Sequence, residues 1–410
     1  MLLRVLVALG IGTLLATGVA AQDVVHVILP DGKGKEIVQT TCAQCHSLNQ
    51  VVSAGHTRDG WRNVVSMMVN VGARLTPEQI DTVTEYLAAN FPEKGGNRAV
   101  IIPGSVDVTI KEWVVPTPGS RPHDPLATAD GDIWYTGQMA NVLGRLDPRT
   151  GTFKEFHLKT PDSGPHGLVA DNAGNIWFTA NFKAYIGKLD PTTGSVTEYP
   201  LDPAARDPHT PLFDRKGILW FTVQSADMVG RLDPRTGAIK IVTVPTPRAN
   251  PYGMVIDSKG VPFFVEFGSN KIASIDPRTM AITEYPLPSS AARPRRVAIT
   301  GDDVLWYSDY GRGYLGRFDP KTGKQTEWPS PGGPKSRPYA IAILRGAIWY
   351  SESGVLPNTL VRFDPATEKF QTWAIPSGGD VVRNMMPTRD GKNIVMACSG
   401  ANRIALVLVK

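Results

Sequence analysis

Two cysteines and a histidine near the N-terminus have the types and spacing of a cofactor-attachment site. Two residues separate Cys42 from Cys45, and His46 follows directly. A C-x-x-C-H motif attaches a c-type haem, because its two thiols add to the porphyrin vinyl groups and its imidazole ligates the iron. The motif therefore predicts one covalent haem c held by Cys42 and Cys45, with His46 as an axial ligand.

Zinc sites and thioredoxin-type dithiols also use C-x-x-C pairs. A zinc site needs a second ligand pair, but Cys398 is the one other cysteine in the 410-residue sequence and there is no His-x₃₋₅-His pair. A thioredoxin motif would lie in a βαβ unit, and the surrounding pattern shows none. Haem is the favoured interpretation.

Residues 22–97 have the pattern of a small all-α domain that could position the motif. A first helix is expected from Gly34 to Cys42, and a second from Asp59 to Val71 with its apolar residues on one face. A third begins with a capping box, in which Thr76 is the N-cap and Gln79 the third helical residue, and Pro92 ends it.

The sixth iron ligand is expected from the apolar face of the second helix. Met68 shares that face with Trp61, whereas Met67 is rotated away from it by roughly 100°. His56 is the second candidate and Met67 the third. The alternative is that Met68 is ordinary core and the iron is five-coordinate or bis-histidine. Ligation by His and Met suits electron transfer.

Residues 30–92 resemble the small monohaem cytochromes c that serve periplasmic dehydrogenases. Besides the haem motif, the resemblance rests on the Trp61, Met68 and Gly72 run and on the Tyr86-Leu87 helix. It implies an electron carrier.

Residues 1–21 have the pattern of a cleaved secretory signal. Arg4 precedes an apolar stretch too short to span a bilayer, and small residues precede Gln22. We expect a periplasmic protein with no integral membrane segment after cleavage. The formal net charge of +5, one less without Arg4, is too weak and dispersed to favour nucleic acid.

The remainder of the chain, residues 98–410, is a repeat. Six aromatic-rich strands such as Ile133–Thr136 are each followed by an Asp-Pro pair, and these aspartates are 43, 43, 43, 43 and 45 residues apart. A seventh, degenerate copy is Ile394–Ala397. Four short strands per period indicate the blade of a β-propeller, so seven blades are predicted. The missing outer strand of the last blade is found at residues 107–116, whose Lys-Glu-Trp matches Lys154–Phe156.

This region resembles the virginiamycin B lyase (streptogramin lyase) family of seven-bladed propellers. Its typical phrases are Gly164–Gly167, Ile176–Thr179 and Ile186–Leu189. The resemblance implies a site in which a histidine, a nearby glutamate and a second glutamate about fourteen residues later surround Mg²⁺. No blade carries that set, because Gly137, Ala180 and Val223 stand fourteen residues after the first three blade histidines.

The repeat predicts two sets of residues at the centre of the propeller. The inner-strand positions follow each blade-opening residue: His123, His166, His209, Tyr252, Arg295, Tyr339 and Arg383. The strand-end positions close each aromatic strand: Gly137, Ala180, Val223, Glu266, Asp309, Glu352 and Cys398. They could be merely solvated channel residues. They could instead form a site, in which Glu266, Asp309 and Glu352 hold Mg²⁺ or Ca²⁺, or Arg295, Arg296 and Arg383 neutralise these acids or clamp an anion.

The predicted protein is therefore a periplasmic cytochrome c domain fused to a propeller that binds a substrate or a redox partner. If it is an enzyme, an oxidoreductase component is favoured over a lyase. The catalytic candidates are His166, His209, Glu266, Asp309 and Glu352. Two alternatives remain: a lyase or hydrolase of the virginiamycin B lyase type with an accessory haem, and a non-catalytic redox sensor or scaffold.

Overall fold

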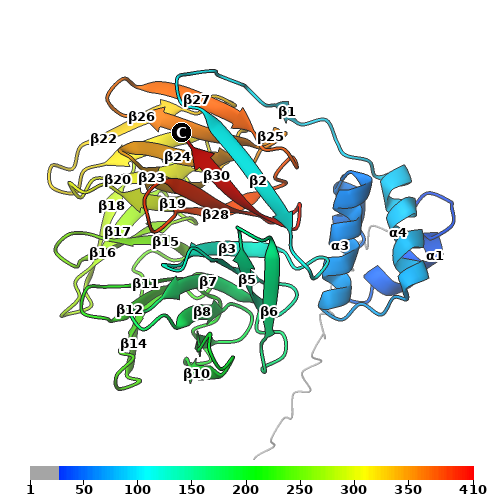
Figure 1. Cartoon of the computed structure of the whole chain (residues 1–410), viewed down its shortest axis with the longest axis horizontal. Coiled ribbons are helices and arrows are strands. Elements are labelled where there is room, and N and C mark those ends of the chain that lie inside the picture. The colour runs from blue at the N-terminus through cyan, green and yellow to red at the C-terminus, as the bar shows by residue number, and fades with distance from the viewer. Residues whose placement is uncertain (1–26) are drawn as a thin grey trace, which may run out of the picture.

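The chain has a helical region, residues 27–96, followed by a β-propeller (Figure 1). The structure is a computed structural model and describes residues 27–410. The predicted signal peptide and its cleavage point before Gln22 lie outside the described residues. Within residues 27–410, no helix combines the length and the hydropathy needed to cross a membrane.

The helical region contains four α-helices and a π-helical turn. They are α1 (Lys35–Ile37), the π-helix η1 (Val38–Cys42), α2 (Asn49–Ser53), α3 (Arg58–Asn70) and α4 (Pro77–Asn90). The capping box of α4 is confirmed, because the backbone N–H groups of Thr76 and Gln79 each donate to the other's side chain. The first expected helix is split into α1 and η1, where the Thr40 hydroxyl donates to the Glu36 carbonyl. The helix α2 was not predicted.

Seven four-stranded antiparallel sheets follow, which confirms the predicted seven-bladed propeller. The first blade contains β3 (Pro122–Ala127), β4 (Ile133–Gly137), β5 (Val142–Asp147) and β6 (Thr152–His157). The second contains β7 (Pro165–Ala170), β8 (Ile176–Ala180), β9 (Tyr185–Leu189) and β10 (Val196–Pro200), and the third contains β11 (Pro208–Phe213), β12 (Leu219–Val223), β13 (Met228–Leu232) and β14 (Ile239–Thr243). The fourth contains β15 (Pro251–Ile256), β16 (Pro262–Glu266), β17 (Lys271–Ile275) and β18 (Ile282–Pro286). The fifth and sixth are β19 (Pro294–Ile299), β20 (Leu305–Asp309), β21 (Tyr314–Phe318) and β22 (Gln325–Pro329), and β23 (Pro338–Leu344), β24 (Ala347–Glu352), β26 (Thr359–Asp364) and β27 (Lys369–Ala374).

The seventh blade joins the two ends of the propeller sequence. It contains β28 (Val382–Pro387), β29 (Asn393–Cys398), β30 (Arg403–Val409) and, as its outer strand, β2 (Val108–Val114). Antiparallel pairing runs from Val108 opposite Val409 to Val114 opposite Arg403. This pairing closes the ring as the Lys-Glu-Trp phrase predicts, and it gives the C-terminal strand β30 a partner on both sides.

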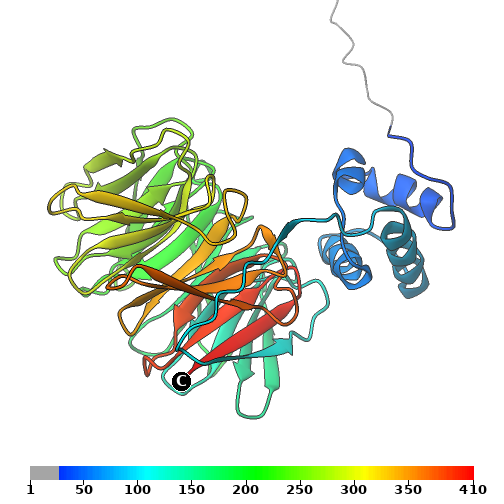
Figure 2. The ribbon, with the colours of Figure 1, turned by 90° about the horizontal axis from the view of Figure 1, so that it is seen from above.

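The segment between the helices and β2 lies along the sixth blade. The short strand β1 (Asn97–Arg98) pairs with β25 (Val355–Leu356), and Thr372 of β27 exchanges backbone and side-chain hydrogen bonds with Ile102. Figure 2 shows this segment running from the helices along the flank of the propeller. The segment is therefore attached to the propeller from residue 97 onward.

Candidate functional site

The helical region forms a cavity of about 200 Å³ that is partly open to solvent. We call it the helical cavity. Its wall includes the three residues of the C-x-x-C-H motif, together with apolar side chains from α3 and α4. The residues that matter for the argument below are Cys42, Cys45, His46, His56, Trp61 and Met68.

Helix α3 presents one face to this cavity because its apolar residues recur every three to four positions. Trp61, Val64, Val65 and Met68 all line it. The Trp61 indole N–H donates to the carbonyl of Phe91, 2.7 Å away, at the end of α4. This bond fixes the indole at the base of the cavity and orients α3 against α4.

The side chain of His46 is oriented by its own backbone neighbour. Its Nδ1 lies 3.1 Å from the Ser47 carbonyl oxygen. With Nδ1–H donating to that carbonyl, Nε2 is the nitrogen left to ligate a metal. Beside it, burial and the charge of Cys45 raise the pKa of the Cys42 thiol.

The structure places the three candidate sixth ligands differently. Met68 and His56 both line the helical cavity, whereas Met67 does not. The His56 ring meets Trp61 edge to face at 4.9 Å. The Met67 backbone instead lies against the propeller, since a Cβ added to Gly119 would come within 2.4 Å of the Met67 nitrogen. The choice between Met68 and His56 stays a prediction.

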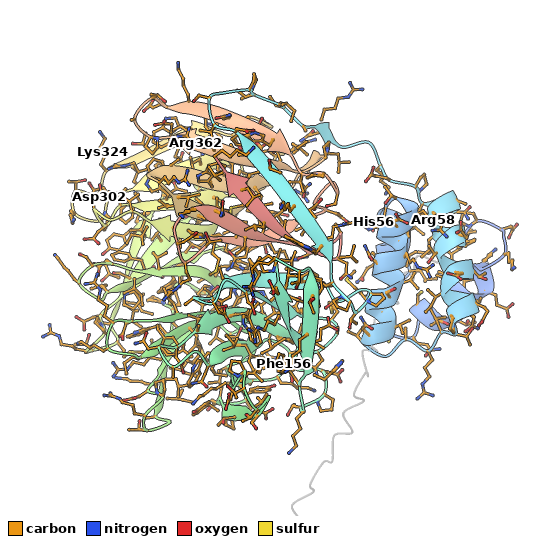
Figure 3. The ribbon with its side chains drawn as sticks, in the orientation of Figure 1. His56, Arg58, Phe156, Asp302, Lys324 and Arg362 are labelled. Carbon is orange, nitrogen blue, oxygen red and sulfur yellow. The ribbon has the colours of Figure 1, made fainter. Side chains whose placement is uncertain are left out.

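A second face of α3 docks on the propeller. Asn63 Nδ2 donates to the Gly400 carbonyl and Asn70 Nδ2 donates to the Pro118 carbonyl, with a donor–acceptor distance of 2.9 Å in both bonds. Gly400 lies between β29 and β30, and Pro118 lies between β2 and β3. These loops belong to the end of the propeller at which the inner strands begin. Figure 3 shows His56 on the propeller side of the helices, and the hairpin residues Asp302 and Lys324 at the far end of the propeller.

The two predicted sets of central residues occupy equivalent places in all seven blades. In each blade the opening residue of the inner strand pairs with the strand-end residue, and a register shift follows. Val382 opposite Cys398 repeats the pairing of Pro122 opposite Gly137, which places Arg383 in the same position as His123. A bulge of this kind redirects the side chain that follows it.

The rings at the inner-strand positions of the first four blades lie close together in a row, each tilted against the next. The ring centroids are 3.6 Å apart between His123 and His166, 3.8 Å between His166 and His209, and 3.9 Å between His209 and Tyr252. The Tyr252 hydroxyl lies 2.5 Å from that of Tyr339 across the centre. Burial, with the four arginines nearby, lowers the pKa of His123 well below its ordinary value. Burial likewise lowers the pKa of His166 and of His209 well below the ordinary value, so the three imidazoles are neutral.

The strand-end acids have hydrogen-bond partners of their own, and the cation site predicted at these three residues stays a prediction. Asp309 accepts from the backbone N–H of Arg293 and from the Arg312 guanidinium. Glu352 accepts from Ser330, Gly332 and Thr359 around its own blade. Both carboxylates therefore accept hydrogen bonds from the chain itself. Glu266 accepts from Ser269, and burial, with the charge of Glu284, raises its pKa to about 7.

The sequence reasoning missed two features of the centre. Asp124 accepts from His123 Nδ1 at 2.9 Å and from Arg296 Nη2 at 2.8 Å, a link between the first and fifth blades. The hydroxyl before the strand end also joins successive blades: Thr136 donates to the His166 carbonyl and Thr179 to the His209 carbonyl. The recurring Thr or Ser of the aromatic strands was the available signal.

Within residues 27–410, the cluster of metal-ligating side chains is His123, Asp124 and His166, whose ligand atoms lie within 4.8 Å of one another. Asp124 is already paired with Arg296, and three further arginines act on His123. A cation here would be repelled by these guanidinium groups. The Mg²⁺ set implied by the family resemblance therefore does not fit the residues present.

Comparisons with known proteins agree with the propeller. Residues 91–363 match the virginiamycin B lyase family. The structure of virginiamycin B lyase from Staphylococcus aureus is 25% identical, covers 74% of this chain and 99% of its own, and has a TM-score of 0.67. A streptogramin B lyase structure is 29% identical, with coverage of 74% and 98% and the same TM-score of 0.67.

A more distant structure shares the fold alone. Kuenenia stuttgartiensis hydrazine synthase is 12% identical, with a TM-score of 0.59, and covers 70% of this chain and 96% of its own. The comparison with curated sequences gave no match.

Proposed function

The chain belongs to the virginiamycin B lyase family of propellers, and on this premise we propose that it is a periplasmic c-type haem protein that transfers electrons. In this proposal the helical region is a monohaem cytochrome c domain, and the propeller binds a substrate or a redox partner. The observation that carries the proposal is the helical cavity, where two thiols, two imidazoles and one thioether line a mainly apolar space.

The residues around the cavity fit a covalent haem. Cys42 and Cys45 lie on one wall and would attach its periphery, while His46 Nε2 is free to ligate iron. The thioether of Met68 or the imidazole of His56 would complete the ligand set. Bound there, the haem would supply one-electron redox chemistry, with a high potential if Met68 is the ligand.

The chain's own residues have three further tasks in this proposal. Trp61, Val65 and Leu87 exclude water from the cavity, and a low dielectric raises the potential of an enclosed redox centre. The Ser47 carbonyl holds the His46 imidazole in one tautomer. The contacts of α3 with the loops at Pro118 and Gly400 keep the cavity close to the end of the propeller where the inner strands begin.

Export supports the same proposal, because c-type haem is attached outside the cytoplasm and residues 1–21 have the pattern of a signal peptide. The lyase alternative has family membership in its favour. It lacks the acid and histidine arrangement, because Asp309 and Glu352 are occupied within their own blades. Electron transfer is therefore the function we propose.

Intact-mass analysis under denaturing conditions tests the proposal. The protein is produced together with a cytochrome c maturation system and compared with the same chain produced without it. We expect a mass increase of one haem that survives denaturation, and reversible one-electron oxidation and reduction of the purified protein. A chain that never acquires covalent haem would overturn the proposal.

A further inference from the structure

Four arginines from three places in the sequence converge at the centre of the propeller. Arg121 lies in the loop before β3, Arg295 and Arg296 lie at the start of β19, and Arg383 lies at the start of β28. All four act electrostatically on the same buried group, His123. We call them the arginine cluster.

The positive charge of this cluster is not balanced by the chain. Within residues 27–410, Asp124 is the one carboxylate that forms an ion pair with any of the four, at 2.8 Å from Arg296. Three guanidinium charges are thus left over. The Nε atoms of Arg295, Arg296 and Arg383 are buried and have no hydrogen-bond partner in this part of the chain. Buried donors without acceptors are costly, which indicates that an acceptor is missing.

The guanidinium group of Arg295 is held by aromatic rings and not by acids. Arg295 Cζ lies 3.8 Å from the ring centroid of Tyr339, 4.4 Å from that of Tyr310 and 4.6 Å from that of Phe267. Contacts of this kind cover the flat faces of a guanidinium and leave its in-plane N–H groups for an acceptor. A planar carboxylate or an oxyanion matches that fork.

The local field already favours negative charge at the same place. Burial alone would raise the pKa of Tyr339, yet Arg295, Arg383 and Arg296 lower it overall. The Tyr339 hydroxyl lies among these arginines, next to that of Tyr252. A buried oxygen whose anion is stabilised in this way marks a position where a ligand oxyanion would be stabilised as well.

The arginine cluster lies at the end of the propeller that carries the helices. Arg121 is three residues from Pro118 and two from Gly119, which contact α3. Arg121, Arg295 and Arg383 are half-buried, whereas Arg296 and the three histidines of the first blades are buried. The first three are therefore the arginines that a ligand entering from this end would reach.

We propose that this mouth is an anion site, in which Arg121, Arg295 and Arg383 donate to a small oxyanion or to the carboxylate group of a substrate. The inference rests on the proposed function at one point only: it names the chemical class of the substrate that the propeller of the haem protein would bind. Such a ligand would supply the missing acceptors and neutralise the excess charge. The same positive charge would repel a metal cation from this site.

Calorimetric titration of the full haem-loaded protein tests the site, with sodium acetate and sodium phosphate as separate probes at constant ionic strength. We expect at least one anion to bind, and Arg383→Gln and Arg121→Gln to weaken it by about tenfold or more. Arg383→Lys keeps the charge but not the fork, and should weaken binding less than Arg383→Gln. Arg235→Gln, an exposed hairpin arginine paired with Asp233, is the matched control and should bind normally.

Each outcome is decisive. Binding of acetate alone points to a carboxylate substrate, and binding of phosphate points to an inorganic oxyanion or phosphoryl group. Binding of neither anion, binding that survives both glutamine variants, or binding of Mg²⁺ in their place overturns the anion site. Haem content is read from the visible spectrum of the same samples. A chain without haem that still binds the anion would refute the proposed function and leave this inference standing.

Discussion

The helical cavity and the mouth of the propeller are built in opposite ways. The cavity takes its attachment residues from five consecutive positions and its remaining wall from helices α2, α3 and α4 and the loops between them, and that wall is mainly carbon. The mouth takes one residue from each of seven strands, and arginines and histidines dominate it. The first site is local and apolar, and the second is distributed and charged. Changes in one should therefore leave the other nearly intact.

The largest expected effect comes from removing both haem thiols. Cys42→Ala combined with Cys45→Ala should abolish covalent haem, since no other thiol lies in the helical region. Thermal unfolding followed by circular dichroism should show a lower transition for the helices and an unchanged one for the propeller. The control variant is Cys398→Ala, in β29 of the seventh blade, and this protein should keep its full haem content. Loss of haem in that control would contradict the assignment.

A core substitution in the propeller tests whether a destabilised propeller leaves the helical cavity unchanged. Trp220 is fully buried, and its indole N–H donates to Asp214 at 3.1 Å. Trp220→Ala should lower the free energy of unfolding by about 3–5 kcal/mol, because it leaves a large cavity between blades. Trp220→Phe should cost less. Denaturant titration measures the loss, and the visible spectrum of the folded variant should match that of the parent. A changed spectrum would show that the two regions are coupled.

The pH dependence of stability should report on Glu266. Its pKa is raised from 4.5 to about 7, first by burial and then by Glu284. Between these values the unfolded chain loses the proton and the folded chain retains it. The free energy of unfolding should therefore fall as pH rises through this window, by up to about 3 kcal/mol.

Glu266→Gln should remove that fall, whereas the exposed Glu368→Gln should preserve it. Denaturant midpoints at pH 4.5, 6 and 7.5 provide the comparison. A parent protein whose stability rises across this window would contradict the buried, protonated state of Glu266.

The contact between the two regions can be weakened selectively. Gly119 has a φ of +66°, and an added Cβ would collide with the Met67 backbone, whereas Gly217, with a φ of +77°, has nothing within 4 Å. Alanine at either position should cost about 1 kcal/mol of backbone strain. Gly119→Ala should in addition release α3 from the propeller, measured as faster hydrogen exchange in α3. Equal exchange in both variants would show that this contact does not hold the helices.

The sequence was sufficient to predict the repeated blades and the features that depend on a short local motif. Seven blades, the closing strand β2 and the capping box of α4 each follow from a short phrase with a fixed backbone requirement. The repeat also identified which residues stand at equivalent central positions. It could not show which of them bond to one another, because pairing across the channel depends on side-chain reach.

Three cases illustrate that limit. Asp124 and Arg296 join the first and fifth blades through a contact between positions 172 residues apart, and no local pattern encodes it. Glu352 was a candidate metal ligand, and the sequence did not show that the hydroxyl groups of Ser330 and Thr359 donate to it. The two candidate iron ligands Met68 and His56 both line the helical cavity, so spacing alone cannot separate them.

The most direct test of the central claim is the visible spectrum of the matured protein, oxidised and then reduced with dithionite, beside Met68→Ala and Met67→Ala. We predict the reduced bands of a covalent haem in all three proteins. The charge-transfer band of a thioether bound to ferric iron should be present in the parent and in Met67→Ala and absent from Met68→Ala. Its persistence in Met68→Ala would exclude Met68 as the ligand. The absence of any covalent haem spectrum would contradict the account as a whole.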